Sequence, residues 1–154
     1  MTRREGRFVV THADEGSAVL KDVDSGQVHT LDDNPGVESA EVIDGVLEPE
    51  PPMEVTYRLA EIDEQRALSV EESPEPPTQQ EREIAADQAV GDVTRRDRAG
   101  IGELHVLTVP EADTEDAVDD VVDDEATLAR AARLGVARVE IRHEPGIVSV
   151  RYMP

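Results

Sequence analysis

Hydrophobic and polar residues alternate along several short stretches of the chain, a period that is typical of strands with one buried face. The clearest of these stretches is Glu103–Val109, which ends at Pro110. Two more, Val136–His143 and Ile147–Met153, are separated only by Glu144-Pro145-Gly146, a sequence that favours a tight turn. We therefore predict three strands in the last third of the chain.

The period lengthens to that of a helix between Thr114 and Gly135, where one long helical segment is predicted. Thr114 is the expected N-cap, because its side-chain oxygen can accept a hydrogen bond from a free backbone N–H of the first turn. Gly135 is the expected end, because glycine readily adopts the left-handed conformation that closes a helix. Residues 103–154 are thus predicted to form a strand–helix–strand–strand unit.

Short alternating stretches also fill residues 6–72, and turn-forming residues separate them. The predicted strands are Arg7–Ala13, Ala18–Val23, Gln27–Leu31, Glu41–Leu47, Glu54–Asp63 and Ala67–Glu71. Asp44-Gly45 interrupts the fourth strand and suggests a bulge, and Asp63-Glu64-Gln65-Arg66 is expected to close a hairpin between the last two. Five or six short strands with turns at this spacing predict a small antiparallel β-barrel over residues 1–72.

Residues 73–102 separate the predicted barrel from the C-terminal unit. Three prolines within residues 73–80 exclude regular helix and sheet there and indicate a linker. Glu81–Val90 is compatible with a short helix, and Asp92–Gly102 is polar and rich in arginine, so we expect a flexible connection in that part. The expected fold class is α+β, with a barrel followed by a strand–helix–strand–strand unit.

The charge of the chain is strongly negative, with 36 acidic residues against 15 basic ones and a net charge of −21. An acidic chain with only 2% aromatic residues is compatible with disorder, or with a folded protein adapted to molar salt. The periodic apolar segments favour the folded alternative. At ~1 M salt the Debye length is about 3 Å, so repulsion between surface carboxylates is largely screened. We therefore expect a halophilic protein that loses compactness when salt is removed.

Several classes of protein are excluded by the composition. The chain has no cysteine, so it has neither a disulfide nor a thiolate nucleophile. Its first residues have no apolar stretch behind the arginines, and no apolar run approaches the ~18 residues of a membrane span. We expect a cytoplasmic protein that makes no membrane contact and is a monomer or a weak homo-oligomer.

Carboxylates and histidines give no catalytic or metal-binding pattern. Five aspartates of the predicted helix recur at intervals of three and four residues and could together hold a hard cation: Asp116, Asp119, Asp120, Asp123 and Asp124. A hydrated acidic helix face explains them better, because cation sites usually also need carbonyl ligands or a sharp loop. The sequence contains neither a phosphate-binding glycine loop nor a nucleophile elbow. We expect no metal, no cofactor and no enzymatic activity.

Arginine is the exception to this acidic background. The candidate contacts for phosphate or for an acidic partner are Arg95, Arg96, Arg98, Arg138, Arg142 and Arg151. Alternation in the strand 136–143 directs Val139 and Ile141 inward and its arginines outward. The alternative is that these arginines only pair with Glu140 and with carboxylates of the helix, which contributes little when the pairs are exposed.

The segments "EVIDGVLE" and "VTYRLAEIDEQRALSVEES" resemble the middle and closing strands of oligonucleotide/oligosaccharide-binding (OB) barrels, in which an Ile-Asp-Glu turn often separates the last two strands. The resemblance covers roughly Gly6–Glu72 and implies nucleic-acid binding. Two features oppose that implication, since single-strand binders offer aromatic platforms and a basic groove. This half has only Phe8 and Tyr57 as aromatics, and its acids outnumber its basic residues.

The whole chain, with its segments "LARAARLGVARVEIR" and "VSVRYMP", resembles small acidic proteins of halophilic archaea that are grouped as an uncharacterised domain of unknown function. That resemblance implies life in molar salt and brings no activity. We therefore expect a non-enzymatic binding or scaffolding protein whose partner is another protein. The alternative is nucleic-acid or ribosome-associated binding through the barrel and Arg95, Arg96 and Arg98.

Overall fold

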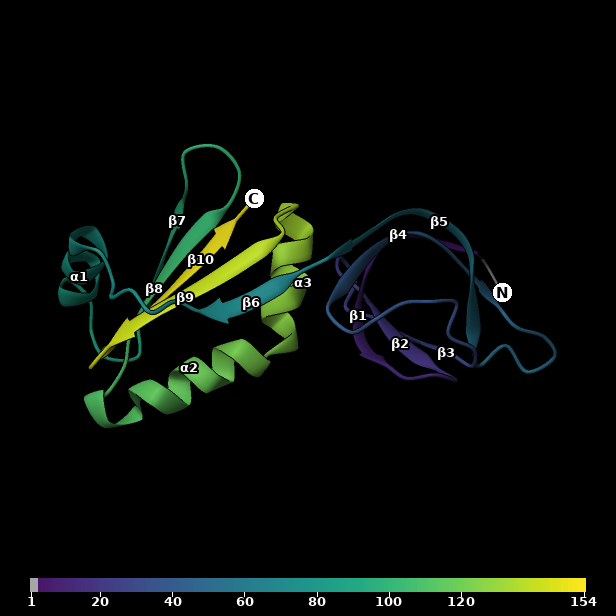
Figure 1. Ribbon diagram of the computed structural model, residues 1–154, viewed down its shortest axis with the longest axis horizontal. Helices are drawn as coiled ribbons and strands as arrows, with labels where there is room; N and C mark the ends of the chain where they lie inside the picture. Colours follow the sequence, from purple (N-terminus) through teal and green to yellow (C-terminus); the bar gives the residue numbers. More distant parts are fainter. Residues whose placement is uncertain (1–2) are drawn as a thin grey trace. The chain divides into compact units, whose positions relative to one another are not determined.

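A computed structural model describes residues 3–154 and consists of two compact units (Figure 1). The first unit runs to Leu68 and includes Leu128–Arg133, and the second comprises Ser69–Thr127 and Leu134–Pro154. The first unit contains a β-barrel, and the second contains an open sheet with helices. The α+β fold class predicted from the sequence is confirmed.

The barrel is closed and has five strands. They are β1 (Arg4–Ala13), β2 (Ala18–Asp22), β3 (Val28–Leu31), β4 (Glu41–Pro49) and β5 (Tyr57–Ala67). Their order around the barrel is β1-β2-β3-β5-β4, and β4 pairs with β1 to close it. All pairs are antiparallel except β3 with β5, which meet in parallel where Leu31 lies opposite Tyr57. The small barrel predicted for this half is therefore present.

The barrel core is built mainly from aliphatic side chains. Its fully buried side chains include Phe8, Leu20, Leu31, Ile43 and Leu47, each 0% exposed. The register of β4 against β5 shifts after Asp44, which confirms the bulge expected at Asp44-Gly45. A Cβ on Gly45 would lie 2.2 Å from the Glu61 carbonyl oxygen, so only glycine allows the two strands to approach this closely.

The hairpin predicted within residues 54–71 is wrong. Asp63-Glu64-Gln65-Arg66 lies inside β5, whose pairing with β4 continues as far as Ala67. The chain then leaves the barrel, and β6 (Ser69–Glu72) pairs in parallel with β9 (Arg138–Glu144) in the second unit. Polar residues are typical of turns and also of the exposed side of a strand, and β5 is largely exposed here.

The second unit is built on a five-stranded sheet in the order β6-β9-β10-β8-β7. Its further strands are β7 (Val93–Asp97), β8 (Glu103–Thr108) and β10 (Ile147–Met153). The three strands predicted in the last third are confirmed as β8, β9 and β10. The prediction of a flexible connection fails at β7, which forms an edge strand paired with β8. An edge strand with exposed side chains needs few apolar residues, so alternation did not reveal it.

A short helix follows the proline-rich stretch, as the sequence suggested. Helix α1 (Gln79–Ala86) begins earlier than expected, because Thr78 and Glu81 form a capping box. The Glu81 N–H donates to the Thr78 hydroxyl at 3.2 Å, and the Thr78 N–H donates to the Glu81 carboxylate at 2.7 Å. The apolar side of α1 places Ile84 and Ala85 against Val106 of β8.

The predicted long helix is two helices, α2 (Thr114–Asp123) and α3 (Glu125–Leu134), preceded by a 3-10 turn at Glu111–Asp113. The break occurs at Asp124, whose backbone is extended and whose carboxylate accepts from the Ala126 N–H at 2.9 Å. Aspartate is a strong N-cap, so Asp124 ends one helix and begins the next.

The ends of this helical region were predicted with mixed success. Thr114 is the first residue of α2 and not its N-cap, because its hydroxyl donates to the Glu111 carbonyl at 2.9 Å and accepts from the Gly146 N–H at 2.9 Å. Gly135 follows α3 with a φ of +75°, as expected for the residue that ends a helix. Across residues 3–154, every helix is too short or too polar to cross a bilayer.

Candidate anion-binding site

The two faces of the second sheet differ. Helix α2 contacts β9 and β10, and the buried side chains Val148 and Val150 of β10 share one face of the sheet. Ser149 and Arg151 alternate with them and therefore lie on the other face, which we call the arginine face. Strand register places Arg96, Leu104, Arg151 and Glu140 in one row across β7, β8, β10 and β9 of this face.

A hollow of about 300 Å³ opens on the arginine face at this row. Its lining includes three arginines, Arg96, Arg98 and Arg151, beside Gln80 of α1 and the partly buried Leu104. One carboxylate, Asp97, also lies on its rim. Three arginines beside the apolar residues Ala99 and Leu104 favour an anionic group as the occupant, since arginine binds carboxylate and phosphate through paired N–H groups.

Arg98 is placed by the turn that follows β7. Its backbone N–H donates to the Gly102 carbonyl at 3.2 Å, and its Nη1 donates to the Ile101 carbonyl at 3.3 Å. Gly102 has a φ of +116°, and a Cβ there would lie 2.0 Å from the Tyr152 carbonyl oxygen and 3.4 Å from Cδ of Arg98. Glycine at this position therefore leaves room for the Tyr152 carbonyl of β10 and for the side chain of Arg98.

Arg151 is positioned by the buried carboxylate of Glu81. Glu81 is 0% exposed, is hydrogen-bonded to the Ser149 hydroxyl, and has one oxygen 3.6 Å from Nε of Arg151. On the other side, Nη1 of Arg151 lies 3.8 Å from the Glu140 carboxylate. A buried carboxylate requires such partners, so the capping box of α1 also fixes the position of an arginine in the hollow.

Of the six arginines predicted as contacts, Arg96, Arg98 and Arg151 converge on this hollow. Arg142 instead contacts Glu140 at 2.6 Å and Glu75 at 2.9 Å, and the hydrogen bond to Glu140 raises the pKa of this arginine. Arg138 is exposed near the end of β9, in register with Met153. Arg95 is paired with His105 and lies on the opposite face from Arg96.

Gln80 and Glu81 were missed by the sequence reasoning. Glu81 carried a usable signal, since threonine followed three residues later by glutamate is a capping box that marks a helix start. No pattern in the sequence indicated that the same carboxylate is buried against Ser149 and Arg151.

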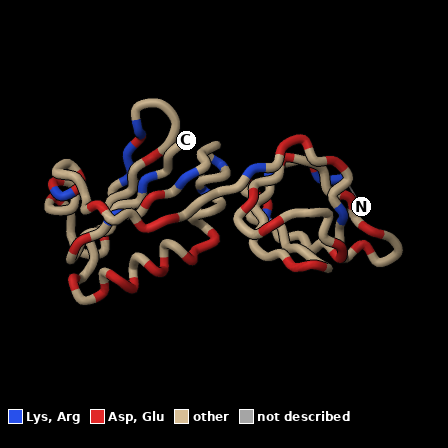
Figure 2. The backbone as a smooth tube through the Cα atoms, in the orientation of Figure 1, with Lys and Arg blue, Asp and Glu red and all other residues tan. Residues whose placement is uncertain are grey.

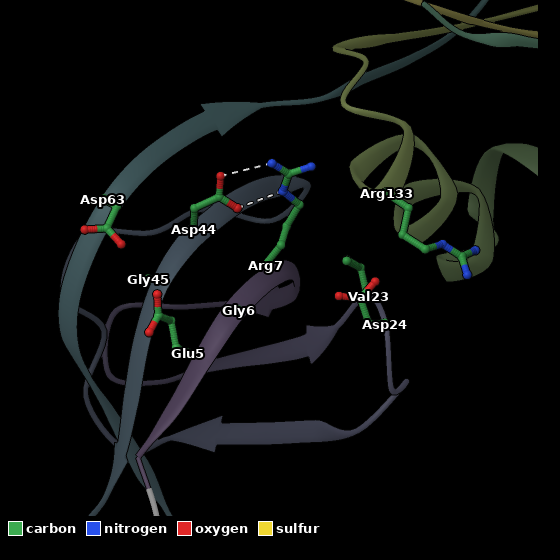
Figure 3. A pocket seen from close by; sticks show the side chains of 9 residues that line it. All are labelled: Glu5, Gly6, Arg7, Val23, Asp24, Asp44, Gly45, Asp63 and Arg133. Atoms are coloured by element: carbon green, nitrogen blue, oxygen red, sulfur yellow. Dashed lines mark hydrogen bonds and ion pairs between the residues drawn. The ribbon is translucent and has the colours of Figure 1, made fainter.

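A second hollow of about 300 Å³ lies in the barrel unit (Figure 3). Two arginines line it, Arg7 and Arg133. Arg7 points to Asp44, and the two side chains share hydrogen bonds of 2.8 and 3.2 Å. This pairing lowers the pKa of Asp44 and raises that of Arg7. Three more carboxylates line the hollow, those of Glu5, Asp24 and Asp63, so it disfavours anions. No group of three or more carboxylates or histidines in the described part of the chain has the geometry to hold a metal ion.

Charge is separated within the second unit (Figure 2). Helix α2 carries acidic residues along its length, whereas β7 and β10 carry arginines. All three aromatic residues of the chain are buried: Phe8 is 0%, Tyr57 is 8% and Tyr152 is 4% exposed. The surface therefore offers arginines without the exposed rings on which single-stranded nucleic acids stack.

Comparison with known proteins gives a family and nothing more specific. The model of a family of unknown function, DUF5812, matches residues 4–143. The sequence matches no curated protein and no solved structure.

Proposed function

The chain belongs to the family of unknown function DUF5812, and from its geometry we propose a binding protein without catalytic activity, whose site takes an anionic group of a partner protein. The site is the hollow on the arginine face. The observation that carries the proposal is the convergence of Arg96 from β7, Arg98 from the turn after it and Arg151 from β10 on one partly apolar depression. On a chain of net charge −21, such a local excess of positive charge is opposed by the general field of the protein.

Arg96 is the arginine most available to a partner. Within residues 3–154 it forms no ion pair, whereas Arg151 lies near Glu81 and Glu140. Arg96 is exposed and stands on an edge strand, so a docking group can reach it without moving the backbone. The proposal therefore assigns Arg96 and Arg98 to contact and Arg151 to a position fixed in advance.

An NMR titration of the full chain with inorganic phosphate, in 1 M KCl, tests the site. We expect the amide signals of β7, β10 and residues 98–104 to shift, with weak affinity that falls as salt increases. Arg98→Gln should weaken binding about fivefold, which is the loss of one charged hydrogen bond at an exposed site.

Arg95→Gln is the matched control, because it removes the same charge from the same strand on the other face. The proposal is wrong if phosphate shifts none of these signals, or if Arg95→Gln weakens binding as much as Arg98→Gln does.

Nucleic-acid or ribosome-associated binding is the second candidate, and the cluster Arg95, Arg96 and Arg98 favours it. We rank it lower because the aromatic residues are buried and the barrel surface is acidic. Pull-downs in 2 M KCl with and without nuclease separate the two functions. Partners that survive nuclease treatment support protein binding, and partners that disappear support the alternative.

We also propose that the protein works in the cytoplasm of a cell with molar salt. The support is the excess of carboxylates, since 36 acidic residues would repel strongly at low ionic strength. Circular dichroism and small-angle scattering should show loss of compactness as salt is lowered from 2 M to 20 mM. An unchanged compact fold in 20 mM buffer would contradict this part of the proposal.

A further inference from the structure

We propose that the anion-binding hollow is one half of a bipolar groove, and that the groove binds a peptide segment carrying one basic and one acidic side chain. This inference rests on the proposed function, and it adds the chemical class of the partner segment. The groove lies between α1 and β7 and ends on the arginine face of the second sheet.

A further hollow of about 300 Å³, which we call the negative hollow, adjoins the anion-binding hollow along β7. The two share Gln80 and Arg96 in their linings, so they are neighbouring parts of one depression. The strand explains the continuity, because Thr94 and Arg96 alternate along β7 and point to the same face, and Arg98 follows in the turn after the strand. We call the whole depression the α1–β7 groove.

The negative hollow takes its name from two carboxylates in its lining. Glu83 and Asp87 line it from α1, four residues apart and therefore on one side of the helix. Asp87 is also the C-cap of α1, where the helix dipole is negative, and no basic residue lies in the last turn. Arg96 is the basic residue of this lining, and it stands at the boundary with the anion-binding hollow.

The floor of this negative hollow is rigid. The Gln88 amide donates to the Val106 carbonyl at 2.9 Å and to the Thr108 hydroxyl at 3.0 Å, and its oxygen accepts from the Thr94 hydroxyl. These bonds join the end of α1 to β7 and β8. Gln88, which these bonds hold in place, lines the hollow together with Glu83 and Asp87.

The groove thus presents carboxylates at one end and arginines at the other. Thr94 lines only the hollow with the carboxylates, and Arg96 lines both hollows. A strand rises about 3.4 Å per residue, so these two positions of β7 are about 7 Å apart. Side chains two residues apart in an extended peptide have the same spacing of about 7 Å. A segment with a lysine or arginine followed two residues later by an acidic residue, or the reverse, satisfies both ends.

Three capped tripeptides test the groove by NMR titration of the full chain in 1 M KCl. The bipolar peptide contains lysine, glycine and glutamate, the anionic peptide replaces lysine by glutamine, and the cationic peptide replaces glutamate by glutamine. We expect the bipolar peptide to bind about fivefold more tightly than the anionic one, as one added exposed ion pair allows. The double variant Glu83→Gln/Asp87→Asn should remove this advantage and leave binding of the anionic peptide in place.

The matched control is Glu115→Gln/Asp119→Asn, which removes two exposed carboxylates at the same spacing from α2. It should preserve the preference for the bipolar peptide. Equal affinities of the bipolar and anionic peptides, or loss of the preference in the α2 control, would overturn the bipolar groove while the anion site stands. Absence of binding by both peptides and by phosphate would instead overturn the proposed function itself.

Discussion

The barrel and the second sheet use their strands in opposite ways. In the barrel every strand is paired on both sides, and the arginine of its hollow that lies on a strand, Arg7, is bound by Asp44. The second sheet leaves β6 and β7 as edges, covers one face with α2, and leaves three arginines around a hollow on the other. Closure removes the edges where a partner can dock, so in this molecule the open sheet is the place where binding can be built.

The two units also differ in how well one buried polar side chain of each is hydrogen-bonded. The barrel buries His29, whose ring packs against the rings of Phe8 and Tyr57 at centroid distances of 6.0 and 4.7 Å. Neither ring nitrogen of His29 has a hydrogen-bond partner among the described residues. The second unit buries Glu81 with three polar partners around it. A buried group that is satisfied positions its neighbours, whereas one that is not satisfied only reduces stability.

The largest effect is expected in the barrel from Gly45→Ala. The new Cβ would meet the Glu61 carbonyl at 2.2 Å, and two paired strands would have to separate. We expect the free energy of unfolding of the barrel to fall by about 3 kcal/mol. Residue-resolved hydrogen exchange measures this in the full chain. Gly16→Ala is the control, because a Cβ there meets nothing within 4 Å; equal effects of the two variants would contradict the prediction.

A smaller loss is expected in the second unit from Glu81→Ala, at about 2 kcal/mol. This change leaves the Ser149 hydroxyl buried without its acceptor and removes the capping box of α1. Hydrogen exchange should increase in α1 and β10 while the barrel strands keep their protection. Glu81→Gln retains the shape and should recover part of the loss. The comparison of the units fails if the barrel is destabilised equally.

The register of the second sheet explains how much of the site could be predicted. The sequence nominated all six arginines by their residue type, and alternation correctly directed Arg138, Arg142 and Arg151 away from the core side. It could not select Arg96 and Arg98 from Arg95, because the strand β7 that separates them was not recognised. Gln80 and Glu81 come from a helix far away in sequence, so only the packing of α1 on β8 and β10 brings them to the site.

The fold was predicted best where the apolar period was strong. The barrel strands and the strands β8, β9 and β10 lie where alternating apolar stretches predicted them. The predictions failed where charged residues are compatible with more than one local structure. The run from Asp63 to Arg66 forms the exposed part of β5, and Asp124 interrupts a helical period that continues across it.

When the pH falls from 7.5 to 5.5, the free energy of unfolding of the barrel should decrease by about 1 kcal/mol more than that of the second unit, because of His29. Burial lowers the pKa of His29 below its usual 6.5, and the charge of Arg4 lowers it further. The unfolded chain then binds a proton below pH 6.5 that the folded barrel does not, so stability is complete above 6.5 and is lost as the pH falls. Urea unfolding at pH 7.5 and 5.5, followed through barrel amides, should show this loss.

The variant His29→Leu sharpens this prediction. It removes the titrating group and two unsatisfied nitrogen atoms, so the barrel should become more stable and less dependent on pH between 7.5 and 5.5. A barrel in the variant that loses as much stability over this range as the unmodified chain would show that His29 is not the cause.

The smallest effect is expected for Asp44→Asn, which removes the carboxylate that binds Arg7 on the barrel surface. Both side chains are partly exposed, at 22% and 34%, so the pair contributes only about 0.5 kcal/mol after solvent screening. The hydrogen bonds from Arg7 lower the pKa of Asp44 below its usual 3.8, so this contribution is present above that value and disappears as the pH falls through the lowered one. The urea midpoints of the variant and the unmodified chain should therefore differ more at pH 7 than at pH 3. If the variant costs several kcal/mol at pH 7, the barrel depends on a surface ion pair as the second unit depends on Glu81, and the contrast between a closed scaffold and an open binding sheet no longer holds.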